Sequence, residues 1–222
     1  MKQKAIPPNQ HVFIAGATGS GKSVLARNYL AGYDNVVCLD IKGDVEWPEV
    51  PEKQLTVVER LQDLPKVKTP KIIYRPVWDE IDFDTINMFF EWIYRRQNCI
   101  VWVDEVMGEA VSPNPFKIPP YYKAILTRGR SRNTAVWSCS QRPSGIAAIT
   151  MSEASHFFVF RLNMVTDRAK IAGITGFPEF ESKPPEFAFW YLNVREDNAK
   201  PKLGRLRLEK QNKLPKKSKE QP

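Results

Sequence analysis

The stretch HVFIAGATGSGKSVLARNYL, residues 11–30, decides the fold. It opens with an apolar run of strand length, and GATGSGKS (16–23) then matches the pattern G-x-x-x-x-G-K-[ST] in full. A helical pattern begins at Lys22 and continues to about Leu30. A strand, a glycine-rich turn and a helix in this order predict a loop that binds phosphate.

Each part of this loop has a physical role. Glycines permit left-handed turns and close approach of the backbone to a ligand. Successive N–H groups and the N-terminus of the following helix then bind anionic oxygens. We expect Lys22 to reach the β- and γ-phosphates of ATP and the Ser23 hydroxyl to bind Mg²⁺. The predicted nucleotide-binding residues are Gly16, Ala17, Thr18, Gly19, Ser20, Gly21, Lys22, Ser23 and Val24.

A second element, CIVWVDE (99–105), is a continuous apolar run that ends in two acids. Such a run is typical of a strand buried on both faces of a parallel sheet, and its carboxyl end is where open α/β sheets bind ligands. We expect Asp104 to hold Mg²⁺ through water and Glu105 to polarise the attacking water. A phosphate loop without a base would only bind nucleotide, so Glu105 favours ATP hydrolysis over binding alone.

The rest of the chain alternates between apolar runs of strand length and helical patterns. The alternation predicts an α/β fold in three layers, with a doubly wound, mainly parallel sheet and antiparallel strands at its C-terminal edge. Further strands are expected at 35–40, 71–77, 135–141 and 156–162, helices at 84–97 and 121–133, and a closing antiparallel pair at 187–194 and 203–209.

Composition and charge limit the number of domains. The 222 residues, 42% of them hydrophobic, suit one compact domain at 11–194, preceded by an extension at 1–10. The net charge is +8, and residues 195–222 carry +6 of it, from ten Lys/Arg and four Asp/Glu. We expect this segment to be a basic strand followed by a disordered tail. The tail is either simply solvated or attracts nucleic acid or an acidic partner nonspecifically.

No apolar run approaches 18 residues and the N-terminus lacks an apolar signal region, so neither a membrane span nor secretion is expected. Cys38, Cys99 and Cys139 are far apart in apolar runs, which predicts buried free thiols in a reducing cytoplasm.

With these residues in place, the chain resembles the FtsK–HerA superfamily of ring-forming, DNA-pumping ATPases over roughly 11–175. LDIKGD (39–44) is similar to the D-x-K-G turn of that family, and SCSQRPS (138–144) is similar to its A-T-Q-R-P-S element. The remaining matches are the glutamate at 105, the Gly129-Arg130 pair, and the adjacent Asp167 and Arg168 that follow HFFVFRL.

The resemblance implies a fold of the additional-strand catalytic-glutamate type, with Gln141 as a polar sensor of the γ-phosphate. Within the superfamily, the length of the chain is similar to that of the minimal genome-packaging ATPases of tailless, membrane-containing icosahedral viruses. We therefore expect a pentameric or hexameric ring that pumps double-stranded DNA nonspecifically into a preformed capsid. The expected partner is a capsid vertex or portal component, and the expected location is the host cytoplasm or the packaging vertex of the virion.

The stretch LTRGRSRN (126–133) carries three arginines at every second position. The resemblance assigns the arginine finger, which acts on the nucleotide of a neighbouring subunit, to Arg130. Arg128 and Arg132 are left with interface roles, and Arg132 takes the finger if the match is displaced by one turn. Lys117 and Lys123, in or beside the Pro-rich segment 112–120, are candidate contacts to the DNA backbone or solvated cations.

Other classes remain open at this point. TRGRSR is also compatible with the arginine-rich lid of a small-molecule kinase, although the Gln-Arg-Pro element argues against that class. A cellular or plasmid DNA pump, a phage assembly or secretion ATPase, and a virion protein that uses nucleotide only as a switch are the further alternatives.

Overall fold

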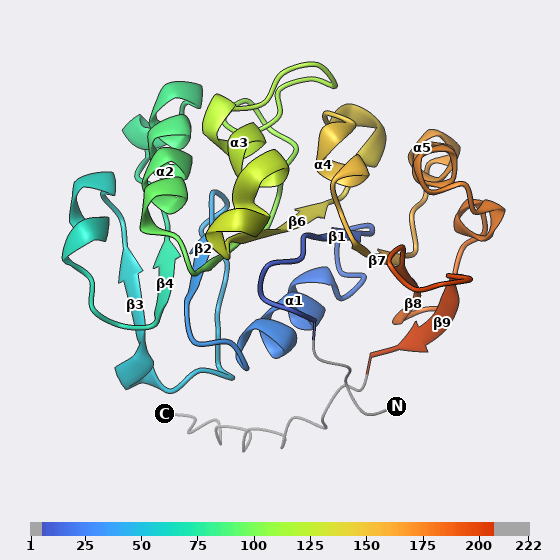
Figure 1. Cartoon of the computed structure of the whole chain (residues 1–222), viewed down its shortest axis with the longest axis horizontal. Helices are drawn as coiled ribbons and strands as arrows, with labels where there is room; N and C mark the ends of the chain where they lie inside the picture. The colour runs from blue at the N-terminus through green and yellow to red at the C-terminus, as the bar shows by residue number, and fades with distance from the viewer. Residues whose placement is uncertain (1–5, 207–222) are drawn as a thin grey trace, which may run out of the picture.

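The computed structural model describes residues 6–206, which form one sheet of nine strands covered by helices on both faces (Figure 1). The strands are β1 (Val12–Ala15), β2 (Val36–Leu39), β3 (Leu55–Val58), β4 (Lys71–Tyr74), β5 (Ile100–Val103), β6 (Ala135–Ser140), β7 (His156–Phe160), β8 (Ala188–Asn193) and β9 (Lys202–Arg205). The α-helices are α1 (Lys22–Leu30), α2 (Phe83–Arg96), α3 (Pro120–Arg128), α4 (Ile149–Ser152) and α5 (Val165–Thr175). Short 3₁₀ helices lie at Glu52–Gln54, Leu61–Lys66, Trp78–Glu80, Gly129–Arg132, Pro143–Gly145 and Pro178–Glu181.

The strand order is β3-β4-β2-β5-β6-β1-β7-β8-β9. The seven strands from β3 to β7 pair in parallel, whereas β8 is antiparallel to both β7 and β9. Both the parallel sheet and its antiparallel C-terminal edge are therefore confirmed. β6 lies between β1 and β5, so an additional strand separates the strand before the phosphate loop from the strand that ends in the two acids.

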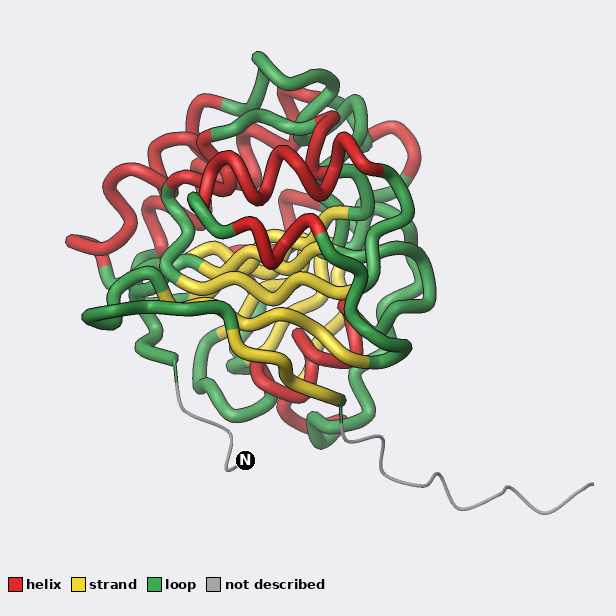
Figure 2. The backbone as a smooth tube through the Cα atoms, turned by 90° about the vertical axis from the view of Figure 1, so that its right-hand side faces the viewer, coloured by secondary structure: helices red, strands yellow, loops and turns green. Residues whose placement is uncertain are grey.

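Three layers result from strands that are apolar on both faces (Figure 2). In β1, Phe13 and Ala15 join the core cluster under α2, α3, α4 and α5, while Val12 and Ile14 join the cluster under α1. Successive side chains of a strand point to opposite faces, which is why a continuous apolar run is needed here. The two cores hold the carboxyl ends of the parallel strands at one edge.

Helix α2 shows how local sequence sets an element. The Asp82 side chain accepts hydrogen bonds from the backbone N–H groups of Asp84 and Thr85, both at 2.9 Å, and so caps the helix N-terminus. Arg95 and Arg96 lie in the last turn, where cations interact favourably with the helix dipole. Its apolar face, Ile86, Phe89, Phe90 and Ile93, is buried against the sheet.

Helix α3 and strand β3 differ from the expectation, and the short helix α4 was not expected. The helix expected at 121–133 ends at Arg128 and continues as a 3₁₀ turn, because Gly129 packs so close to the Thr134 carbonyl that a Cβ would lie 2.5 Å from its oxygen. Strand β3 was not expected. It is a four-residue strand at the edge of the sheet in which only Val58 is buried, so it lacks the apolar run of the central strands.

Cys38, Cys99 and Cys139 are free and buried, as expected. Residues 6–10, assigned to the N-terminal extension, pack on the domain, since Ile6 joins the core under α1. Within residues 6–206, no helix is long and apolar enough to cross a membrane. The expected tail, and the end of the strand expected at 203–209, lie outside the described residues.

Candidate nucleotide-binding and catalytic site

The phosphate loop joins β1 to α1 with the backbone geometry that its glycines allow. Gly19 and Gly21 have φ values of 73° and 105°, in the left-handed region that other residues rarely adopt. A Cβ on Gly16 would lie 2.7 Å from the Phe160 Cβ, so this position also requires glycine. No side chain caps the N-terminus of α1. Its N–H groups are therefore available to an anion.

The Lys22 side chain is folded into this loop, where its Nζ donates to the Ala17 carbonyl at 3.1 Å. The residue is only 6% exposed. Burial lowers the pKa of Lys22, and the negative charges of Glu105 and Asp104 oppose that shift. A phosphate bound in the loop would stabilise this poorly solvated cation.

Ser23 and Asp104 bring two hard oxygen donors together. The Ser23 hydroxyl donates to Asp104 Oδ1 at 2.7 Å, and Asp104 follows β5 with 7% exposure. Burial raises the pKa of Asp104, and the hydrogen bond from Ser23 opposes that shift. Among the described residues, no group of three or more His, Cys, Asp or Glu side chains could hold a metal ion alone. One hydroxyl and one carboxylate instead fit Mg²⁺, which completes its coordination with phosphate oxygens and water.

Glu105, one residue further along, has both carboxylate oxygens engaged. Oε1 accepts from the backbone N–H groups of Met107 and Gln141, each at 3.3 Å. Oε2 forms an ion pair with Lys42 Nζ, also at 3.3 Å. Glu105 directly follows Asp104, so a second carboxylate comes one residue after the one that accepts from Ser23.

Gln141 connects the phosphate loop to Glu105 from the end of the intervening strand β6. Its side-chain Oε1 accepts a hydrogen bond of 2.6 Å from the Thr18 hydroxyl, while its backbone N–H donates to Glu105. The structure therefore brings together Lys22, Ser23, Asp104, Glu105 and Gln141, which were all predicted from the sequence.

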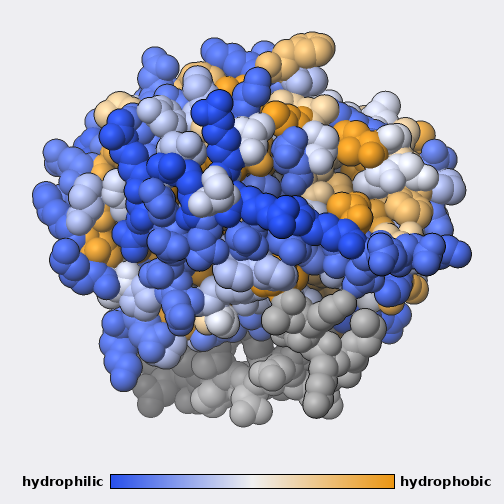
Figure 3. Space-filling model, in the orientation of Figure 1, coloured by the Kyte–Doolittle hydropathy of each residue, from blue (hydrophilic) through white to orange (hydrophobic). Residues whose placement is uncertain are grey.

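In Figure 3, strongly hydrophilic side chains cover the middle of the face shown, and apolar ones gather toward the upper right.

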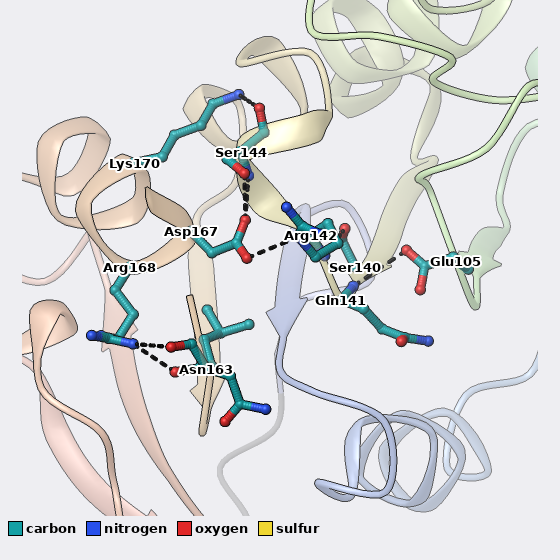
Figure 4. Close-up of polar contacts among 10 residues, drawn as sticks. Glu105, Ser140, Gln141, Arg142, Ser144, Asn163, Asp167, Arg168 and Lys170 are labelled. Carbon is teal, nitrogen blue, oxygen red and sulfur yellow. Dashed lines mark hydrogen bonds and ion pairs between the residues drawn. The ribbon is translucent and has the colours of Figure 1, made fainter. Parts of the chain in front are cut away.

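The loop after Gln141 is anchored by the buried carboxylate of Asp167 (Figure 4). Asp167 Oδ2 accepts from Arg142 Nε at 3.1 Å, and Oδ1 accepts from the Ser144 backbone N–H at 2.9 Å and the Ser144 hydroxyl at 2.6 Å. The neighbouring Arg168 donates from one guanidinium nitrogen to the carbonyls of Leu162 and Asn163. Asp167 and Arg168 thus tie the loop after Gln141 and the turn after β7 to α5.

Sequence reasoning did not include Lys42 among the site residues. The D-x-K-G pattern was the available signal, but it does not show which side chain Lys42 meets. Because β2 and β5 pair in parallel with Leu39 opposite Val103, the turn after β2 lies beside Glu105. The Asp167 anchor was likewise visible only as part of a family pattern.

The three arginines of 128–132 have different environments. Arg132 is held within its own subunit, since its Nε donates to the Tyr94 carbonyl at 3.1 Å and its guanidinium lies 4.0 Å from the centre of the Tyr94 ring. Arg128 and Arg130 are exposed. All three precede β6, whereas Gln141 follows it, and a six-residue strand is about 20 Å long. Arg130 therefore lies at the end of the sheet opposite its own phosphate loop.

The candidate DNA contacts, Lys117 and Lys123, are both exposed. Lys117 Nζ lies 4.2 Å from the centre of the Phe83 ring, a cation–π contact that holds the loop against the start of α2. Neither lysine contacts the phosphate loop, so their assignment to DNA stays a prediction.

The DNA packaging ATPase P9 of Enterobacteria phage PRD1 is 28% identical over 172 residues, an alignment that covers 74% of this chain and 69% of the phage protein. The chain is homologous to a viral DNA packaging ATPase. No protein-family model matches the sequence.

Structures of the genome packaging NTPase B204 from Sulfolobus turreted icosahedral virus 2 share the fold. The complex with sulfate has a TM-score of 0.70 at 16% identity and covers 92% of this chain and 100% of B204. The complex with AMPPCP has a TM-score of 0.67 at 15% identity, covering 89% and 98%. The pCW3 conjugation coupling protein TcpA, at a TM-score of 0.55 and 14% identity, covers 89% of this chain and 60% of TcpA.

Proposed function

We propose that this chain is an ATP hydrolase that packages double-stranded viral DNA into a preformed capsid. The observation that carries the proposal is the meeting of Lys22, the Ser23–Asp104 pair and Glu105 at the carboxyl ends of β1 and β5. Homology to the packaging ATPase of phage PRD1 supports the genome-packaging role.

In this account the uncapped start of α1 and Lys22 bind the β- and γ-phosphates of ATP. The Ser23 hydroxyl and Asp104 would hold Mg²⁺, which neutralises charge on the phosphate oxygens when bound. Glu105 orients the attacking water and accepts its proton. Gln141 contacts both Thr18 of the phosphate loop and Glu105, and the next residue, Arg142, pairs with Asp167. Loss of the γ-phosphate therefore alters contacts that continue from the phosphate loop to Asp167.

Arg130 is proposed as the finger that completes the site of a neighbouring subunit. Its exposure, and its position at the opposite end of β6 from the phosphate loop, are what a residue acting on another subunit requires. Such a finger contributes on the order of 10³–10⁵ in rate, which makes hydrolysis dependent on assembly into a ring of five or six subunits.

Lys117 and Lys123 are proposed to contact the DNA backbone. A motor that moves any sequence needs phosphate contacts rather than base contacts, and exposed lysines supply them. The proposed docking partner is a capsid vertex, where the chain would act during assembly of the virion.

Subunit mixing tests the ring and the finger together. Arg130→Ala subunits keep a complete ATP site, and Lys22→Ala subunits keep the finger, so each alone should be inactive while a mixture hydrolyses ATP. Arg132→Ala is the matched control, because the Tyr94 contacts hold Arg132 in its own subunit. A mixture without activity, formed from variants that fold and assemble, would contradict the role of Arg130 in a neighbouring subunit.

A further inference from the structure

The turn that follows β2 is built around a fully buried carboxylate, that of Asp40. Its Oδ1 accepts from the backbone N–H groups of Gly43 at 2.9 Å and Asp44 at 3.3 Å. Its Oδ2 accepts from the Val45 N–H at 3.1 Å and from Arg75 Nε at 2.9 Å. A buried charge is costly unless it is paired and hydrogen-bonded, and four donors meet that need here.

This network fixes the backbone of 41–45, and Gly43 adopts the left-handed conformation, with φ of 75°, that the turn requires. Lys42 lies inside the turn but none of the Asp40 bonds involves it. Its side chain instead reaches across to the next strand, where Nζ lies 3.3 Å from Glu105 Oε2. The rigid turn therefore presents one cation to the carboxylate proposed to activate water.

The two side chains of the Lys42–Glu105 ion pair differ in their exposure to solvent. The Lys42 side chain is 39% exposed, whereas that of Glu105 is 10% exposed. Within residues 6–206, Glu105 is the one ion-pair partner of Lys42, and no backbone carbonyl holds its ammonium group. Only the lysine end of the pair is open to solvent, so its ammonium group can leave Glu105 without being buried elsewhere, and the flexible lysine stem can reach a new partner.

The position of Lys42 also places it near the other charges of the site. Its charge opposes the burial that raises the pKa of Asp104, and it adds to the burial that lowers the pKa of Lys22. A γ-phosphate bound between Lys22 and Glu105 would bring new negative charge to this point. It would compete with the Glu105 carboxylate for the ammonium group of Lys42.

We propose that Lys42 is a second phosphate-binding lysine that leaves Glu105 for the γ-phosphate when ATP binds. The exchange frees Oε2 of Glu105, the one carboxylate oxygen that backbone N–H groups do not hold, to accept the attacking water. Lys42 thereby makes the site distinguish ATP from ADP, because ADP lacks the group that draws it away. The inference rests on the proposed binding of ATP at the phosphate loop.

Equilibrium binding tests the exchange without hydrolysis. The dissociation constants for ADP and for the non-hydrolysable analogue AMPPCP are measured for the wild type, Lys42→Met and Lys42→Arg. Lys42→Met should weaken AMPPCP binding about tenfold, the effect of losing one charge-assisted hydrogen bond, and leave ADP binding unchanged. Lys42→Arg should keep most of the preference for AMPPCP. Lys66→Met is the control, since Lys66 is exposed and pairs only with Asp63 in the described chain.

A purely structural role for Lys42 predicts something else. The melting temperature would fall in Lys42→Met, and ADP and AMPPCP binding would weaken together. That result, or equal affinities of Lys42→Met and wild type for both nucleotides, would overturn the inference while leaving the nucleotide site in place. Wild-type binding of neither nucleotide, or normal binding by Lys22→Ala, would instead overturn the proposed nucleotide site itself.

Discussion

The backbone N–H of Gln141 donates to the Glu105 carboxylate across 3.3 Å, although the two residues lie 36 positions apart. The contact exists because β6 pairs in parallel with β5, so that both strands end at the same edge of the sheet. On its other side β6 pairs with β1, and the Gln141 side chain meets Thr18 of the phosphate loop. One residue thus connects the loop that binds phosphate to the proposed base.

Glu105→Gln should abolish turnover while leaving nucleotide binding intact. The amide keeps the shape of the side chain but accepts a proton poorly, so kcat should fall by about 10²–10⁴. Phosphate release and the dissociation constant for AMPPCP are the measurements. Glu109→Gln is the control, because Glu109 is exposed in the same loop. Retention of more than half of the wild-type kcat in Glu105→Gln would remove this residue from the mechanism.

Removal of Mg²⁺ by a chelator should stop hydrolysis, and Ser23→Ala should raise the Mg²⁺ concentration needed for half-maximal rate. The hydroxyl that pairs with Asp104 at 2.7 Å is then missing from the proposed coordination shell. Ser152→Ala, which changes an exposed serine of α4 whose hydroxyl donates to the Ile149 carbonyl, is the control. An unchanged Mg²⁺ dependence in Ser23→Ala would show that the hydroxyl is not a ligand.

Asp167→Ala should destabilise the fold by about 3 kcal/mol, because it leaves Arg142 and the Ser144 N–H without their buried acceptor. Ser144→Ala removes only the hydroxyl bond of 2.6 Å and should cost about 1 kcal/mol. Urea unfolding of both variants gives the two free energies. Equal effects of the two substitutions would argue against Asp167 as the anchor of the loop that follows Gln141.

Stability should fall as the pH drops from 7 toward 4, because burial lowers the pKa of His11 to about 4. The unfolded chain binds a proton below its ordinary value near 6.5 while the folded chain does not, so protonation favours unfolding in this window. The free energy of unfolding should decrease by about 2 kcal/mol from this group between about pH 7.5 and pH 5.

His11→Asn is the matched variant for this measurement. Its side-chain oxygen can accept the 2.9 Å hydrogen bond that His11 Nδ1 receives from the Val136 N–H, but it does not titrate. Between about pH 7.5 and pH 5, the free energy of unfolding of the variant should decrease by about 2 kcal/mol less than that of the wild type. An identical slope in both proteins would assign the acid sensitivity to other groups.

The fold could be predicted because its signals are local. The glycines of the phosphate loop indicate the strand before it and the helix after it. Each central strand is visible in the sequence as an apolar run, because both of its faces are buried. β3 gave no such signal, since an edge strand needs few buried residues. The end of α3 at Arg128 was not predicted either. It depends on the close approach of Gly129 to the Thr134 carbonyl, which no sequence pattern indicates.

Within the site, the sequence supplied the residues attached to strand ends but not the contacts made across strands. Ser23, Asp104 and Glu105 follow from motif and position. The pairing of Lys42 with Glu105, and of Arg142 with Asp167, depends on which strands become neighbours and in what register. The different environments of Arg130 and Arg132 likewise depend on Tyr94, which lies in another helix.

The most direct test of the proposed function is the rate of ATP hydrolysis by the assembled protein with and without double-stranded DNA. Measurement at two salt concentrations is needed, since backbone contacts weaken as salt rises. The account predicts that DNA of any sequence stimulates the wild-type rate, with less stimulation at the higher salt and none in Lys22→Ala. An ATPase rate that DNA leaves unchanged at both salt concentrations would contradict a DNA-pumping role and favour a kinase or a nucleotide switch.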